Sequence, residues 1–140
     1  MKNVTINCSE KEAFLIEKAL DLYSRISMGQ FKKIGQVTSI QRKLWNDDTD
    51  TKEFDDRCDD LKEVFGLSKG SYWGIFNKEN VDDDAREAAH MQQAMRHERY
   101  LHRMRTGEQK ESHGTLDEYP ADICVIARMT APNFKMNIEE

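Results

Sequence analysis

The sequence predicts an α+β fold that is mostly helical, with three or four helices packed against a small antiparallel sheet. Long segments with apolar residues at helical spacing predict the helices, and apolar–polar alternation at both ends of the chain predicts the strands. A chain of 140 residues has the size of one domain with a core of its own. We therefore expect residues 1–140 to form a single domain.

The predicted strands lie close to the two ends of the chain. Residues 2–7 and the residues after Pro132 place apolar side chains at every second position, as half-buried strands do. These side chains are Val4, Ile6, Phe134, Met136 and Ile138. Residues 123–127 form a further short, apolar, β-prone run. The three strands are expected to pair into the antiparallel sheet, with the termini side by side.

A helix is expected to begin directly after the first strand. Ser9 and Glu12 have the spacing of a capping box, in which each side chain bonds the backbone N–H of the other residue. The apolar residues that follow recur at helical spacing and predict a broad buried face. They are Leu15, Ile16, Ala19, Leu20, Leu22, Tyr23 and Ile26. Gly29, after Met28, is expected to cap this helix or to allow close approach of another backbone.

Two more helices are predicted between Gly35 and Gly66. The first is indicated by Ile40, Leu44 and Trp45. Residues 46–60 hold eight acidic and two basic side chains, and Asp50 and Glu53 repeat the capping-box spacing. An apolar stripe follows one side of this second helix: Phe54, Cys58, Leu61, Val64 and Phe65. Its outer face is strongly acidic, which indicates either a solvated surface or one that shields or mimics an anionic partner.

The longest predicted helix runs from Val81 to Arg105. Three aspartates at positions 82–84 offer N-cap oxygens and suit the positive end of the helix dipole. Between Ala85 and Arg105 the chain has five Arg, two Glu and three His, in a protein of formal charge −5. This helix is therefore positively charged in a chain that is negatively charged overall.

Loops flank this helix on both sides. Residues 67–80 contain two glycines and a close group of large apolar side chains: Tyr72, Trp73, Ile75 and Phe76. Apolar surface of this density is costly to leave in water, so the loop is expected to pack or to bind. Residues 106–122 are polar and predict either a long irregular connection or a mobile segment before the last strands.

Composition narrows the classes of function. No run approaches the roughly 18 apolar residues of a membrane span, and the N-terminus has no apolar core of a signal peptide. The three cysteines are widely spaced, which argues against a disulfide framework and a zinc site and for a reducing cytoplasm. An acidic isoelectric point of about 5.4 disfavours duplex nucleic acid as the main partner.

No catalytic or metal-binding motif is complete. His90 and His97 are seven residues apart, about 10 Å along a helix, so they cannot share one metal. Glu87 and His90 match only one half of a di-iron carboxylate motif. No glycine-rich nucleophile turn surrounds a serine, and no phosphate-binding loop is present. We therefore expect a protein without enzymatic activity, metal or cofactor.

Two groups of residues are candidates for binding a small anionic ligand. Arg86, Gln93, Arg96 and His97 lie on the basic helix, where arginine suits phosphate and His or Gln suits base edges. Gln30, Phe31, Tyr72 and Trp73 offer polar edges and stacking rings. The alternative is that the arginines pair with the acidic residues 46–60 and hold the helices together.

At these residues the chain resembles a family of small phage and prophage proteins of unassigned chemistry. The resemblance lies in three motifs: Met-Gly-Gln-Phe at 28–31; Ser-Tyr-Trp-Gly-Ile at 71–75; and Ala-Arg-x-Ala at 85–88 followed by Gln-x-x-Arg-His at 93–97. Trp73 departs from a shorter Ser-Tyr-Gly-Ile pattern. The resemblance covers about half of the chain. It implies an origin in phage and an anti-defence role, because short phage proteins often block a defence protein or sequester its nucleotide signal.

Two functions follow as hypotheses. The first is a sponge, a protein that captures a cyclic or ADP-ribose-type nucleotide signal without chemistry. The second is an acidic protein–protein inhibitor, in which residues 47–60 occupy a basic surface of a host defence or nucleic-acid-binding protein. A homo-oligomer is expected in either case, because the apolar content of 38% is lean while the aromatic side chains look exposed.

Overall fold

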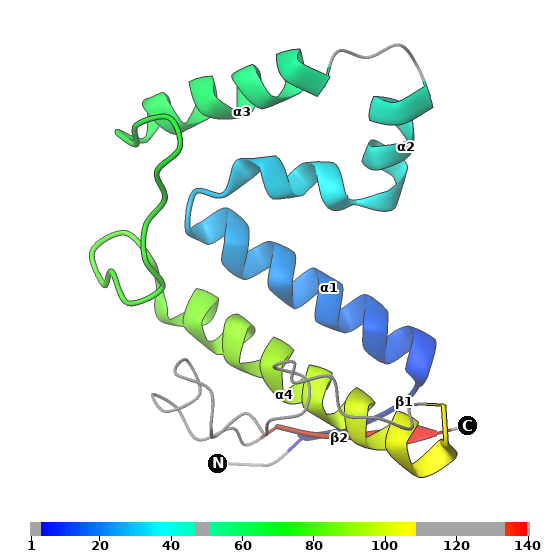
Figure 1. Cartoon of the computed structure of the whole chain (residues 1–140). Coiled ribbons are helices and arrows are strands. Elements are labelled where there is room, and N and C mark those ends of the chain that lie inside the picture. Colours follow the sequence, from blue (N-terminus) through cyan, green and yellow to red (C-terminus); the bar gives the residue numbers. More distant parts are fainter. Residues whose placement is uncertain (1–3, 47–50, 109–133, 140) are drawn as a thin grey trace. The chain divides into compact units, whose positions relative to one another are not determined.

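The computed structural model describes residues 4–46, 51–108 and 134–139 (Figure 1). The elements in chain order are β1 (Val4–Ser9), α1 (Glu10–Ser27), the 3-10 helix η1 (Phe31–Gln36), α2 (Thr38–Asn46), α3 (Thr51–Val64), α4 (Asp83–Thr106) and β2 (Phe134–Glu139). The mostly helical α+β class is thereby confirmed. None of the described helices is both long and apolar enough to cross a membrane.

By its contacts the chain divides into two compact units. The terminal unit contains Met1–Asp21 and Arg86–Glu140, and the central unit contains Leu22–Ala85. Both α1 and α4 pass from one unit into the other along the chain. Each unit is described below by itself.

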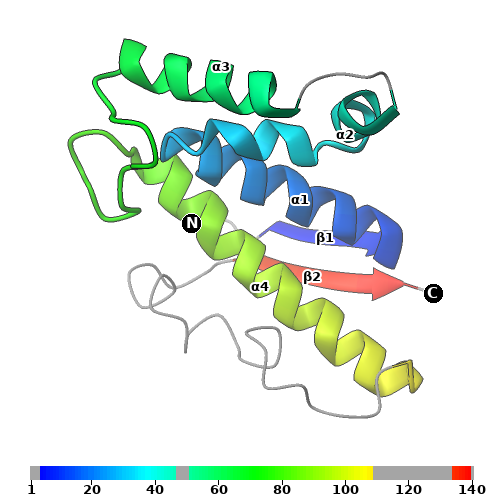
Figure 2. The same cartoon turned by 45° about the horizontal axis from the view of Figure 1, so that its top comes forward.

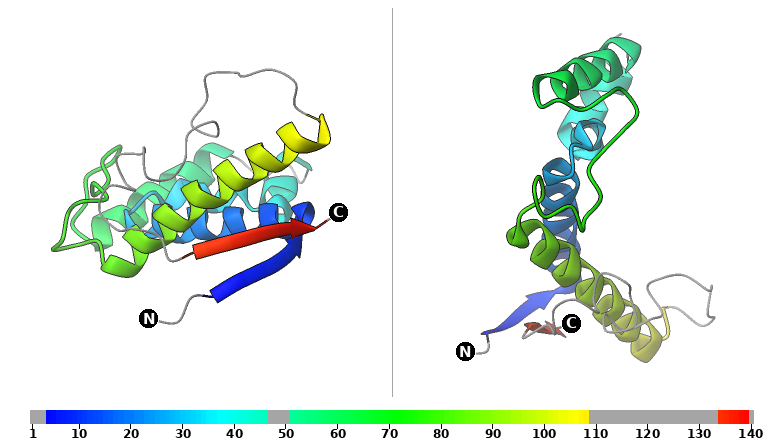
Figure 3. Two further views of the ribbon diagram at one scale, coloured as in Figure 1. Left: turned by 90° about the horizontal axis from the view of Figure 1, so that it is seen from below. Right: turned by 90° about the vertical axis from the view of Figure 1, so that its left-hand side faces the viewer.

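The sheet of the terminal unit is parallel. β1 pairs with β2 from Val4 opposite Phe134 to Ser9 opposite Glu139, and both strands run in the same direction (Figures 2 and 3). The antiparallel sheet expected from the sequence is therefore wrong. Alternation of side chains marks a strand but not its direction, and strands separated by most of the chain need no hairpin. The predicted strand at 123–127 and the polar segment before it fall outside the described residues, apart from 106–108.

The core of the terminal unit lies where the strands meet the two helices. Buried Cys8, Ala13 and Met95 form its centre. The partly buried side chains packed against them are Ile6, Ile16, Leu20 and Ile138. The capping box that begins α1 is confirmed by the Glu12 N–H, which donates to Ser9 Oγ at 3.3 Å. In return, the Ser9 N–H and hydroxyl both donate to Glu12 Oε2 at 2.8 Å. These two hydrogen bonds lower the pKa of Glu12.

The buried side of α1 differs in part from the predicted one. Leu15 is 68% exposed and Tyr23 is 47% exposed, whereas Glu17 is buried. Arg99 Nη1 donates to Glu17 Oε2, and Arg103 Nε donates to Glu10 Oε1 at 2.6 Å. Periodicity counts a glutamate as a surface residue, so it could not find a helix side that is buried through an ion pair.

The central unit packs α2 and α3 against η1. A Cβ at Gly35 would lie 3.1 Å from Phe54 Cε1, which shows how closely η1 and α3 approach. The apolar stripe predicted for α3 is only partly buried. Cys58 is buried, while Leu61, Val64 and Phe65 are 40%, 75% and 54% exposed. Lys62 takes a buried place on α3 instead.

The first turn of α4 begins as predicted. Asp82 Oδ1 accepts a hydrogen bond of 2.7 Å from the Ala85 N–H, which makes Asp82 the N-cap. The helix then continues to Thr106, and Gly107 follows with a φ of 76°. Asp50, predicted to cap α3, lies outside the described residues.

Candidate ligand site

Two of the three motif segments meet in the central unit. The Trp73 N–H donates to the Met28 carbonyl at 2.9 Å, which joins residues 71–75 to the end of α1. Gly29, beside Met28, has a φ of +79°, and a Cβ there would lie 2.4 Å from Leu67 Cδ1, so this position favours glycine. We call residues 28–31 and 71–75 together the aromatic corner.

Two of the predicted stacking rings support the aromatic corner from inside. Phe31 is only 7% exposed, and its ring lies 5.7 Å from that of Phe65, centroid to centroid. Trp73 is half-buried and packs with Ile75 against the apolar cluster of Met28, Val81 and Ala85. Phe31 therefore serves packing, and Trp73 has only part of its ring available to a ligand.

Tyr72 and Gln30 form the accessible part of the aromatic corner. Tyr72 is 58% exposed, although both of its neighbours are fixed by backbone hydrogen bonds. Gln30 is half-buried, and its Oε1 accepts a hydrogen bond of 3.3 Å from Arg25 Nη1. The sequence did not reveal the contact between Arg25 and Gln30, because a five-residue spacing across a helix end has no periodic signature.

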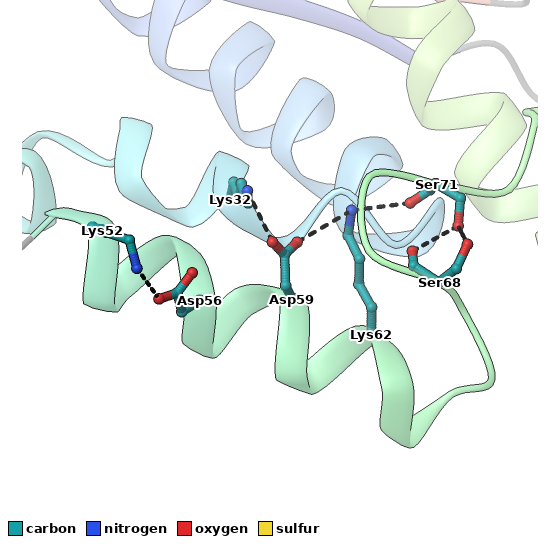
Figure 4. Close-up of polar contacts among 7 residues, drawn as sticks. All are labelled: Lys32, Lys52, Asp56, Asp59, Lys62, Ser68 and Ser71. Atoms are coloured by element: carbon teal, nitrogen blue, oxygen red, sulfur yellow. Dashed lines mark hydrogen bonds and ion pairs between the residues drawn. The ribbon is translucent and has the colours of Figure 1, made fainter.

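A buried lysine holds the loop that leads to Tyr72. Lys62 Nζ donates to the Ser71 carbonyl at 2.9 Å and lies 3.9 Å from Asp59 Oδ1 (Figure 4). Lys32 Nζ approaches the other oxygen of Asp59 at 3.2 Å. Ser68 and Ser71 bond each other through their hydroxyls at 2.9 Å. Nothing in the sequence pointed to Lys62 except its place among the apolar positions of α3.

The remaining predicted ligand residues belong to α4 in the terminal unit. Gln93, Arg96 and His97 are half-buried and share one side of the helix, since they are three and four residues apart. The His97 ring stacks on that of Tyr100, with 6.3 Å between centroids. Arg86 is only 8% exposed. The structure thus brings Gln30, Phe31, Tyr72 and Trp73 together in one unit and places the α4 residues in the other.

The ion pairs of α4 bear on the alternative reading of its arginines. Arg99 and Arg103 pair with carboxylates of α1, within the terminal unit. The carboxylates of α3 pair with cations of the central unit: Asp56 with Lys52, Asp59 with Lys32 and Lys62, and Glu53 and Asp60 with Arg57. For Arg99 and Arg103, the expected pairing with the acidic segment is therefore replaced by pairing with α1.

The residues that the structure describes form no metal site, and the two thiols among them are buried. No three His, Cys, Asp or Glu side chains are grouped there so that they could hold a metal ion. Cys8 and Cys58 are buried free thiols, and burial raises the pKa of each. A raised pKa leaves a thiol protonated and weakly nucleophilic. Neither described thiol has the environment of a catalytic cysteine.

No protein-family model, curated protein or solved structure matched the chain. Function has to be inferred from the residues themselves. The aromatic corner is the best candidate site, because two motif segments meet there and present an exposed ring.

Proposed function

We propose that the protein binds and sequesters a small anionic nucleotide signal without chemical turnover, as an anti-defence sponge of phage type. The observation that carries this proposal is the exposure of Tyr72 on a fixed loop. Its ring is 58% exposed on a loop whose backbone is hydrogen-bonded on both sides of it. An exposed aromatic ring on a fixed backbone is suited to stacking on a base, since little entropy is lost when the ligand arrives.

The aromatic corner would recognise the base of the nucleotide. Tyr72 offers a flat apolar face, and the accessible part of Trp73 adds to it. The Gln30 amide can donate to and accept from base edges, and Arg25 fixes its orientation through the bond to Oε1. Stacking on one ring contributes about 1–3 kcal/mol per base.

The terminal unit offers, by itself, a second group of candidate ligand residues on α4 that suits phosphate. Arg96 offers a guanidinium that can bond two phosphate oxygens at once, and Gln93 and His97 lie beside it on the same side of the helix. Arg86 is buried and would act from beneath the surface. We propose that the protein assembles as a homo-oligomer in the host cytoplasm, with no metal or cofactor, and that it does not act as an enzyme.

Calorimetric titration with cyclic nucleotides and ADP-ribose derivatives tests this proposal. Wild type should bind at least one of them, and Tyr72→Ala should weaken binding at least about tenfold, because stacking of this kind is worth about 1–3 kcal/mol. Trp45→Ala is the matched control, since Trp45 is a ring of α2 that is 71% exposed and lies outside the aromatic corner. Equal affinities for Tyr72→Ala and Trp45→Ala would contradict the proposal.

A second candidate function follows from α3. Val64 and Phe65 are exposed at its end, beside the exposed carboxylates of Asp55, Asp56 and Asp60. Exposed apolar side chains beside a charged surface are typical of protein-binding faces. The partner would be a basic, nucleic-acid-binding surface of a host protein.

Changing the three exposed aspartates to asparagine separates the two functions. Asp59 stays unchanged in this variant, because it lies between Lys32 and Lys62 and its loss would leave Lys62 buried without its carboxylate. Nucleotide capture predicts that the triple variant keeps nucleotide affinity and biological activity. Loss of activity in this variant, with no nucleotide binding by wild type, would favour the acidic inhibitor.

A further inference from the structure

Lys62 is a buried cation outside the set of residues that the proposed function uses. Its side chain is only 7% exposed. Burial of an ammonium group is unfavourable unless its protons meet acceptors, so a lysine in such a place needs specific partners. The structure supplies one neutral and one charged partner, and both belong to the central unit.

The neutral partner is the backbone of the aromatic corner. Lys62 Nζ donates to the Ser71 carbonyl at 2.9 Å, directly before Tyr72 (Figure 4). Asp59 Oδ1 lies 3.9 Å from the same nitrogen, beyond hydrogen-bond distance, and balances its charge. The hydrogen bond of the ammonium is thus made to the loop, while the carboxylate provides electrostatic compensation.

The backbone of Lys62 holds the beginning of the same loop. Its carbonyl accepts hydrogen bonds of 3.0 Å from the N–H groups of Phe65 and Leu67, and Gly66 has a φ of +77°. This is the Schellman ending of a helix, with the Gly66 N–H bonded to the Glu63 carbonyl at 3.1 Å. One residue of α3 therefore fixes the loop where it leaves the helix and again at Ser71.

We infer that Lys62 is a positioning residue for the aromatic corner. Its ammonium fixes the carbonyl that precedes Tyr72, and the Trp73 N–H that follows is fixed on the Met28 carbonyl. Tyr72 is held between these two bonds with its ring in solvent. The effect on ligand affinity rests on the proposed function, whereas the effect on loop order does not.

The test compares Lys62→Met with Lys32→Met in the ligand-free protein. Both variants remove an ammonium beside Asp59, but only Lys62 bonds the loop. Hydrogen exchange at the Trp73 amide should become at least about tenfold faster in Lys62→Met, because a hydrogen bond from a charged donor is lost. Acrylamide quenching of Trp73 fluorescence, in a Trp45→Phe background, should increase in the same variant. Lys32→Met should change neither measurement.

Equal exchange at Trp73 in the two variants would overturn the inference. So would an acceleration in Lys62→Met that is uniform over α3 and η1, because that result would mean a general loss of stability. If Lys62→Met does not fold, Lys62→Gln takes its place, since it removes the charge and keeps a polar end. Lys62→Arg should restore part of the protection.

Nucleotide titration separates this inference from the proposed function. If wild type binds a nucleotide, Lys62→Met should weaken that binding about tenfold, and Lys32→Met should not. Absence of nucleotide binding by wild type would contradict the proposed function and leave the exchange result as the test of Lys62. If exchange at the Trp73 amide is unchanged in Lys62→Met and wild type binds a nucleotide, only the positioning role of Lys62 is contradicted.

Discussion

His90 is a titratable residue that is buried on α4, and its burial affects the stability of the fold. His90 is 1% exposed on α4, and burial lowers its pKa against the opposing effect of Glu87. The folded protein therefore protonates His90 at a lower pH than the unfolded chain, in which the imidazole binds a proton below about pH 6.5. The unfolded state gains protons first as the pH falls, so His90 makes the fold less stable in acid.

The stability of the protein should therefore fall between pH 7.5 and 5.5. The free energy of unfolding, measured by urea titration, should decrease by at most about 1.4 kcal/mol per pH unit from this one group. His90→Gln should flatten that decrease, while His97→Gln, at a half-buried position on the same helix, should keep it. An identical slope in His90→Gln and wild type would show that another group is responsible.

Gly29 is a second residue whose place in the fold restricts which amino acid it can be. Gly29 has a φ of +79°, and a Cβ there would lie 2.4 Å from Leu67 Cδ1. Gly70 has a φ of +77°, but a Cβ there would have no other atom within 4 Å. Gly70→Ala should cost about 1 kcal/mol from backbone conformation alone. Gly29→Ala should cost about 1–3 kcal/mol more, because Leu67 must also move. Equal melting temperatures for the two variants would contradict the close packing at the aromatic corner.

At the scale of elements, α1 and α4 of the terminal unit are joined by charge as well as by apolar packing. Arg99 bonds the buried Glu17 and also lies over the Phe14 ring, with its Cζ 4.4 Å from the centroid. Ala13 and Met95 supply the apolar part of the same contact. The pair is shielded from water, so removal of one partner leaves an uncompensated charge.

Glu17→Ala should destabilise the protein by about 3–5 kcal/mol in urea unfolding. The double variant Glu17→Leu, Arg99→Met replaces the pair by apolar groups and should recover most of that loss. Glu10→Ala is the control, because its pair with Arg103 is more exposed and should be worth about 1 kcal/mol or less. A double variant as unstable as Glu17→Ala would show that the ion pair itself is required.

Local chemistry predicted the elements better than their arrangement. The Ser9–Glu12 capping box, the aspartate that caps α4 and the alternation at both ends of the chain gave the positions of α1, α4 and the two strands. Strand direction was missed, because side-chain alternation is the same for either direction. The buried sides of α1 and α3 were missed in part, because Glu17 and Lys62 are buried through polar partners that lie elsewhere in the sequence.

At the scale of the whole molecule, the candidate site was only partly accessible to sequence reasoning. The motifs at 28–31 and 71–75 were recognised separately, and the hydrogen bond from Trp73 to Met28 joins them. Phe31 is an aromatic residue that could stack on a ligand, but its side chain is buried. Only the fold decides which aromatic ring faces solvent. Lys62 was missed for the same reason, since its role depends on a carbonyl of the loop.

A homo-oligomer remains a prediction for the whole molecule, and it rests on exposed apolar side chains. Leu15, Trp45 and Val64 are each more than two-thirds exposed in the single chain. Large apolar side chains in such number are costly in water, which is the physical reason to expect a homo-oligomer. Subunit number and retained ligand are best measured together.

Native mass spectrometry of the protein purified from cells with an active nucleotide-signalling defence tests the capture of a signal most directly. Wild type should have a mass above the 16.4 kDa of one chain, together with a small molecule that is released on denaturation and absorbs as a nucleobase does. Tyr72→Ala should keep the subunit number and lose the small molecule, while Trp45→Ala should keep the small molecule. A wild-type monomer without a retained molecule, active in those cells, would contradict nucleotide capture.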